Sequence, residues 1–80
     1  MSQAEDIVTG LGGPTNILEV EACITRLRTQ VRDITLIDEP ILRNAGAHGI
    51  MRRGPIIQVV LGPGANNVAN DIGQMLVSGQ

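Results

Sequence analysis

The sequence predicts an α+β domain built as a two-layer sandwich: a four-stranded antiparallel sheet with three helices on one face. Hydrophobic spacing alternates between helical and strand periods in the order α-β-β-α-β-β-α. The connections between these segments are short, which favours antiparallel neighbours. The chain has 80 residues, enough for one modest core. We therefore expect residues 1–80 to form a single domain.

A capping box predicts the first helix. The alternation of apolar and polar residues predicts the two strands that follow, and this alternation shifts by one residue between them. Ser2 and Glu5 form a capping box at the start of a short helix, which a cluster of glycines ends. Apolar and polar residues then alternate from Leu18 to Ile24, as in a strand with one buried face. In residues 26–32 the apolar positions shift by one, so a continuous strand would bury arginines. A tight turn or a bulge must therefore lie near residues 23–26, although no Gly, Asn or Pro there predicts it.

The second half of the chain predicts a helix, two strands and a final helix. Asp38 is placed to cap the first of these helices. Strands are expected around residues 50–51 and from Ile56 to Leu61, and the second is apolar on both sides. We expect that strand to be the most buried. Helical spacing returns near the end, with Asn66 or Asn67 as the N-cap.

Composition excludes several classes of function. The chain has no Phe, Tyr or Trp, so no side chain can stack on a base or a sugar ring. All six basic residues are arginine and the formal net charge is −2, which argues against general affinity for nucleic acid or anionic lipid. One cysteine cannot form an internal disulfide, and no apolar stretch approaches the ~20 residues of a membrane span. We expect a soluble, cytoplasmic protein.

The lone cysteine is the leading candidate for chemistry. Cys23 lies between residues 1–22, which carry four acids and no base, and residues 23–32, which carry three arginines and no acid. Strand parity places it on the polar face with Glu19 and Glu21, away from the core. Positive charge favours the thiolate, which is the nucleophilic form of cysteine. The alternative is a small buried hydrophobic residue, which is the commoner role of a free cysteine.

Two arginines beside the cysteine are candidates for binding a phosphoryl group. Arg26 and Arg28 lie two apart in a strand and therefore share a face, where two guanidinium forks could hold an anion. The Thr25 hydroxyl and a bent backbone from Cys23 to Thr25 could add further donors. The alternative for the arginine pair is a solvated stripe at a sheet edge.

No other residue or motif in the sequence predicts a catalytic or nucleotide-binding site. His48 has no visible carboxylate to orient it, so a surface or loop position is expected. The turn at residues 62–67 lacks the Gly-Lys-Ser/Thr ending of a nucleotide-binding loop. A phosphatase loop would need arginine six residues after Cys23, but Thr29 stands there. We expect no metal and no cofactor.

One extended signature surrounds the cysteine. It runs Gly12-Gly13-x-x-Asn16-Ile17-x-x-Val20-x-Ala22-Cys23-Ile24-Thr25-Arg26-Leu27-Arg28-x-x-Val31-x-Asp33. Further matches follow at Asp38, Gly46-Ala47-x-Gly49 and Gln58-Val59-Val60-x-Gly62. The chain thus closely resembles the B component of bacterial phosphoenolpyruvate-dependent sugar phosphotransferase systems, of the glucose and N-acetylglucosamine type. Cys-x-Thr-Arg-Leu-Arg is shared by several sugar types, so it identifies the component better than the sugar.

The resemblance implies a phosphoryl relay. Cys23 would accept a phosphoryl group from a phosphohistidine of the A component. It would pass that group to a sugar moving through the membrane-embedded C component. Arg26, Arg28 and Thr25 match the positions beside the cysteine, and Ile24 and Thr25 would help to bind the phosphoryl group. We expect the arginines to matter most in the onward step, where they balance transition-state charge.

The resemblance also bears on partners. Docking is expected to use Glu21, Ile24 and Leu27, with the arginines steering both partners electrostatically. Glucose-type members tend to carry Asp two residues before the cysteine, where this chain has Glu21. Of the two sugars, N-acetylglucosamine is favoured over glucose. We expect a monomer, a separate C polypeptide, and transient work at the inner face of the cell membrane. The alternative function is a non-catalytic regulatory or nucleic-acid-binding module that uses the arginine face.

Overall fold

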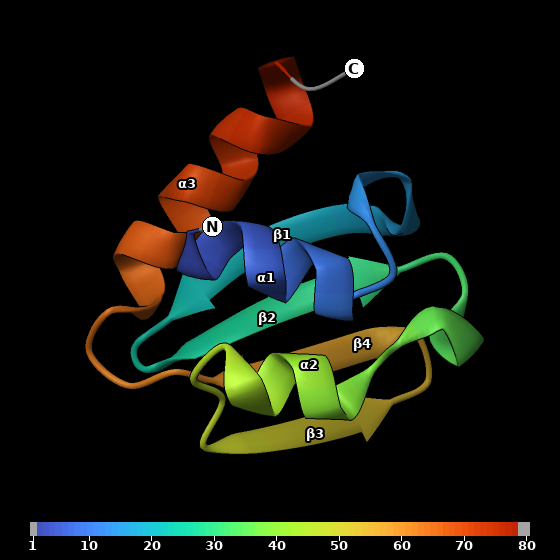
Figure 1. Cartoon of the computed structure of the whole chain (residues 1–80), viewed down its shortest axis with the longest axis horizontal. Coiled ribbons are helices and arrows are strands. Elements are labelled where there is room, and N and C mark those ends of the chain that lie inside the picture. The colour runs from blue at the N-terminus through green and yellow to red at the C-terminus, as the bar shows by residue number, and fades with distance from the viewer. Residues whose placement is uncertain (1, 79–80) are drawn as a thin grey trace.

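The computed structural model describes residues 2–78 and has the predicted order of elements (Figure 1). The helices and strands are α1 (Gln3–Gly10), β1 (Ile17–Cys23), β2 (Arg26–Val31), α2 (Glu39–Asn44), β3 (Gly49–Arg53), β4 (Ile56–Val60) and α3 (Ala65–Ser78). Two short 3-10 turns, Pro14–Asn16 and Ile34–Leu36, join them. The predicted α+β fold is thereby confirmed.

The sheet has the strand order β1-β2-β4-β3, with all neighbours antiparallel. The central strands β2 and β4 bury alternate side chains, and no residue of β4 is exposed. The three helices lie over this buried face, α1 and α2 in front of the sheet and α3 beside β1 (Figure 1). The other face is left uncovered by residues 2–78, and the charged side chains of β1 and β2 lie on it.

The core between sheet and helices is aliphatic and closely packed. Its largest fully buried side chains include Ile7, Leu11, Leu42, Ile57 and Ile72. At Gly10, where α1 meets α2, an added Cβ would lie 2.6 Å from Leu42 Cδ2. The absence of a side chain at Gly10 therefore permits the close approach of the two helices.

A buried asparagine joins three segments at one end of the molecule. Asn16 is 3% exposed, and its Nδ2 donates to the carbonyls of Leu11 at 2.7 Å and Asp33 at 3.1 Å. Its Oδ1 accepts from the backbone N–H of Asp33 at 2.9 Å. Asn16 thus ties the end of α1 to both strands that carry the candidate site.

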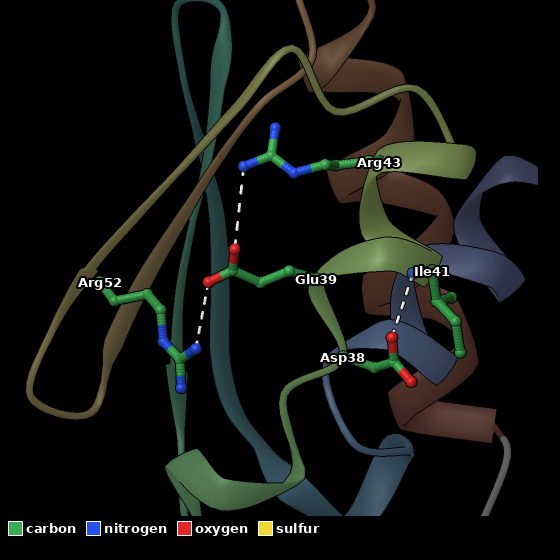
Figure 2. A network of polar contacts seen from close by, with 5 residues as sticks. All are labelled: Asp38, Glu39, Ile41, Arg43 and Arg52. Atoms are coloured by element: carbon green, nitrogen blue, oxygen red, sulfur yellow. Dashed lines mark hydrogen bonds and ion pairs between the residues drawn. The ribbon is translucent and has the colours of Figure 1, made fainter.

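The start of α2 is fixed by two acidic side chains (Figure 2). Asp38 caps the helix, as predicted, by accepting from the backbone N–H of Ile41 at 3.2 Å. Glu39 lies between two arginines, with Arg52 of β3 at 3.1 Å and Arg43 of α2 at 3.8 Å (Figure 2). Only the pair with Arg52 joins α2 to the sheet, and exposed ion pairs of this kind add little to the free energy of unfolding.

Two local predictions are wrong. Leu18 was expected on the buried face but is 44% exposed, because the β1–β2 register shifts between Ile17 and Glu19. Either Asn66 or Asn67 is expected to cap the last helix, but α3 begins at Ala65, so both lie in its first turn. Within residues 2–78, no helix combines the length and apolarity needed to cross a membrane.

Candidate active site

The candidate site is the turn between β1 and β2. Cys23 ends β1 and Arg26 begins β2, and the two residues pair directly across the hairpin. Of the two devices that the sequence left open, the structure has the tight turn, made by Ile24 and Thr25. Cys23 is a free, exposed thiol, as strand parity predicts. Ile24 lies in the turn and is 89% exposed, which leaves its side chain available for the expected docking contact.

The backbone of Ile24 is strained. Its φ is 60°, and it is the single non-glycine residue with positive φ among residues 2–78. Hairpin turns that need positive φ at their first central residue usually place glycine there. A β-branched residue in this region costs on the order of 1–3 kcal/mol. The backbone thus has the conformation of a glycine turn while the sequence has isoleucine there, so no local turn signal marks the reversal.

The turn is held in place from the end of β4. The carbonyl of Thr25 accepts two hydrogen bonds, from the backbone N–H groups of Leu61 and Gly62, each at 2.9 Å. Gly62 itself has a φ of 85°, which only glycine adopts readily. These bonds fix the backbone next to Cys23 and help to offset the strain at Ile24.

Both arginines lie on the same face of the sheet as the thiol. Arg26 is directly opposite Cys23, and Arg28 is the next residue of β2 on that face, opposite Glu21. Directly opposite Cβ atoms in such a pair are ~5 Å apart, and diagonal neighbours are ~7–8 Å apart. Neither guanidinium forms an ion pair with a carboxylate of residues 2–78, so both charges can balance an incoming anion.

The structure adds one residue that the sequence reasoning did not include in the site. Gln58 of β4 accepts a hydrogen bond on Oε1 from Arg26 Nη1 at 3.3 Å. It pairs with Arg28 in the β2–β4 register, so it lies on the same open face. An amide carries no charge, and it therefore orients Arg26 without neutralising it. The cross-strand register reveals this contact, which no local sequence pattern shows.

The remaining predicted site residues divide by exposure. Glu21 is exposed on the open face near Cys23, and Thr25 is half-buried in the turn. Leu27 is 0% exposed, because odd-numbered positions of β2 face the helices. It has no surface to offer a partner, so its expected docking role is wrong. His48 is exposed before β3, as expected.

Comparison with known proteins identifies the family. A family model described as "phosphotransferase system, EIIB" matches residues 5–38. A Streptomyces coelicolor protein, "PTS system N-acetylglucosamine-specific EIIB component", is 53% identical over 75 residues, covering 94% of this chain and 97% of that protein. The chain belongs to the EIIB family of the phosphotransferase system. EIIB proteins are phosphotransferase components, and the predicted resemblance is confirmed.

Two further relatives agree with this EIIB assignment. A Bacillus subtilis protein, "PTS system N-acetylglucosamine-specific EIICB component", is 39% identical over 67 residues, which span 82% of this chain and 15% of that protein. A solved domain "of the PTS system, IIabc component from Clostridium difficile" superimposes with a TM-score of 0.76 at 25% identity. That match covers 90% of this chain and 76% of the solved chain.

Proposed function

We propose that this EIIB domain carries a phosphoryl group on Cys23, accepting it from a phosphohistidine of an A component and passing it to a sugar. The observation that carries this proposal is the position of Cys23, exposed at a fixed turn and directly opposite an arginine. An anchored turn presents the thiol to large partners, and the arginine pair supplies positive charge beside it.

The proposed chemistry consists of two displacements at phosphorus. In the first, the Cys23 thiolate forms an S–P bond while the P–N bond of the phosphohistidine breaks, and its electron pair returns to the imidazole. In the second, a sugar hydroxyl oxygen attacks phosphorus, the hydroxyl proton passes to solvent, and the S–P bond breaks with its electron pair remaining on sulfur. Such transfers depend mainly on alignment and on stabilisation of charge over the phosphoryl oxygens.

Each residue of the turn has a proposed part in these steps. Arg26 and Arg28 would bind the phosphoryl oxygens and balance the charge that develops in each transition state. The backbone N–H groups of Ile24 and Thr25 would donate to the same oxygens. Glu21 and the exposed side chain of Ile24 would contact the partners, one by charge and one by apolar surface.

We further propose N-acetylglucosamine as the sugar and a membrane C component as the acceptor partner. The S. coelicolor relative named for N-acetylglucosamine covers nearly the whole of this chain. The B. subtilis relative, by its name, combines a C and a B component for the same sugar. The domain would then work in the cytoplasm, at the inner face of the membrane. These relatives give no support to a nucleic-acid-binding module.

Mass spectrometry tests the phosphocysteine directly. The domain is mixed with a phosphorylated A component, and the intact protein is expected to gain one phosphoryl group on Cys23. Prior alkylation or Cys23→Ala should abolish this gain. Added salt should slow the transfer if the arginines steer the encounter. Phosphorylation at another residue, or none at all, would overturn the proposal.

Sugar identity is tested with the reconstituted relay. Phosphorylated A component, this domain and C component in vesicles are supplied with N-acetylglucosamine or glucose. Faster phosphorylation of N-acetylglucosamine is expected. A preference for glucose would overturn the sugar proposal and leave the relay intact.

A further inference from the structure

A groove of about 760 Å³ runs between α3 and β1, next to the turn that carries Cys23. Its strand side consists of Val20, Glu21 and Ala22, the residues just before Cys23. Because three consecutive strand residues line it, the groove meets the edge of β1 and not only one face. β1 is an edge strand, and Figure 1 shows α3 beside it.

The backbone at this edge is available for pairing. Arg32 donates its backbone N–H to the carbonyl of Asn16 at 2.9 Å, so the even-numbered residues of β2 bond toward β1. Their partners, such as Glu21, use their own backbone groups inside the sheet. The intervening residues Val20 and Ala22 therefore direct their N–H and C=O groups outward, toward the groove.

The charged side chains around the groove are all of one sign. A second hollow adjoins it, and both are lined in part by Gln74 of α3. The charged side chains that line the two hollows are all acidic: Glu21 in the groove, and Glu5 and Asp71 in the adjoining hollow. None of these three acids forms an ion pair within residues 2–78. An occupant with positive charge therefore fits this surface better than an acidic or a purely apolar one.

We propose that the groove binds an extended, basic cytoplasmic segment of the membrane C component, which pairs with β1 as an added strand. This inference rests on the proposed function, in which the C component is the acceptor partner. Cytoplasmic loops of membrane proteins carry an excess of Lys and Arg, the charge that this surface lacks. Main-chain pairing supplies affinity in strand addition, and the acids supply selectivity. Because the groove ends beside Cys23, the added strand brings the phosphocysteine to the sugar site.

Charge substitutions on α3 test the predicted polarity. Asn70 is exposed and lines the groove, whereas Asn67 is exposed on the same helix and lies outside it. The measurement is the concentration of domain that half-saturates sugar phosphorylation by C component in vesicles, at low salt. We expect Asn70→Arg to raise it about threefold and Asn70→Glu to lower it about threefold. Asn67→Arg and Asn67→Glu should leave it unchanged. If both Asn70 variants match the wild type, the inference is overturned.

Filling the groove provides a steric test. A Cβ at Gly73 would meet no atom within 4 Å, so Gly73→Leu occupies the groove without disturbing the core. It should raise the half-saturating concentration by roughly tenfold or more and leave phosphorylation of Cys23 by the A component unchanged. Gly73→Ala is the matched control for helix propensity. An unchanged half-saturating concentration in a folded Gly73→Leu domain would count against the groove.

Hydrogen exchange tests the added strand without any transfer reaction. The amides of Val20 and Ala22 should exchange more slowly when C component in nanodiscs is added, and more slowly than with empty nanodiscs. Unchanged exchange, or equal slowing by the A component, overturns the inference. Failure of the A component to phosphorylate wild-type Cys23 would instead overturn the proposed function, so the two failures are distinguishable.

Discussion

Cys23 and Arg26 form the residue pair that closes the β1–β2 hairpin, so the thiol and the guanidinium extend from directly opposite positions on one face of the sheet. Arg28 follows on the same face. In the proposed function, this arrangement would hold one phosphoryl group between the sulfur and two positive charges.

Lysine substitutions test the role of the guanidinium forks. Arg26→Lys and Arg28→Lys keep the charge but lose bidentate hydrogen bonding. We expect each to slow transfer from Cys23 to sugar by about 10- to 100-fold, and transfer onto Cys23 by less. Single-turnover rates of the two steps give the comparison. Arg53→Lys, on the same face in β3, is the control and should change neither rate. Equal small losses in both steps would contradict the assignment.

Gln58 tests whether Arg26 must be held in place. Gln58→Leu removes the acceptor on Arg26 and should slow transfer by roughly fivefold. Gln58→Glu places a carboxylate beside the same guanidinium and should slow transfer further, because it neutralises the charge that the phosphoryl group needs. A double-mutant cycle with Arg26→Lys checks the coupling. Additive effects would show that Gln58 does not act through Arg26.

Ile24 should reveal a conflict between stability and transfer. Ile24→Gly relieves the positive φ and is expected to raise the free energy of unfolding by about 1 kcal/mol, after the entropic cost of glycine. The same change removes an exposed apolar side chain from the turn, so acceptance from the A component should slow. Urea unfolding and stopped-flow transfer provide the two measurements. Ile24→Val keeps the strain and should differ little from the wild type in stability.

Asn16 should be among the most destabilising polar positions to truncate. Asn16→Ala leaves the backbone groups of Leu11 and Asp33 without their side-chain partner in a buried site. We expect a loss of about 2–4 kcal/mol in the free energy of unfolding. Asn44→Ala, at the exposed end of α2, should lose far less. The comparison is made from the denaturant concentration at half-unfolding, with the dependence of the unfolding free energy on denaturant the same in all variants.

Asp33 makes the stability of the domain depend on acid pH. Hydrogen bonds from the hydroxyl and then the backbone N–H of Thr35 hold the pKa of Asp33 below its usual value of 3.8. The ionised form therefore stabilises the fold above that value, and the contribution is lost as the pH falls through the lowered pKa. The stability advantage of wild type over Asp33→Asn should shrink between about pH 5 and about pH 3. A constant difference would show that the carboxylate charge is immaterial.

The exposure of Cys23 was predictable because side chains alternate strictly along a strand. The change of phase between β1 and β2 also located the reversal. The exposure of Leu18 was not predictable in this way, because the bulge in β1 inserts an extra residue and no local sequence signal marks it. The contact between Gln58 and Arg26 depends on the register of segments 32 residues apart in the chain. Such long-range pairing is set by the packing of the whole sheet and cannot be deduced from either segment alone.

The two bonds from the end of β4 to the Thr25 carbonyl have a consequence for how partners sense the state of the domain. Because this backbone is clamped, the phosphate proposed for Cys23 should be gained and lost with nearly no change in the shape of the turn. Donor and acceptor must then tell a loaded carrier from an empty one by its negative charge. The charge at Cys23 would then determine which of the two components binds. Replacement of one component by the other would require no conformational change of this domain.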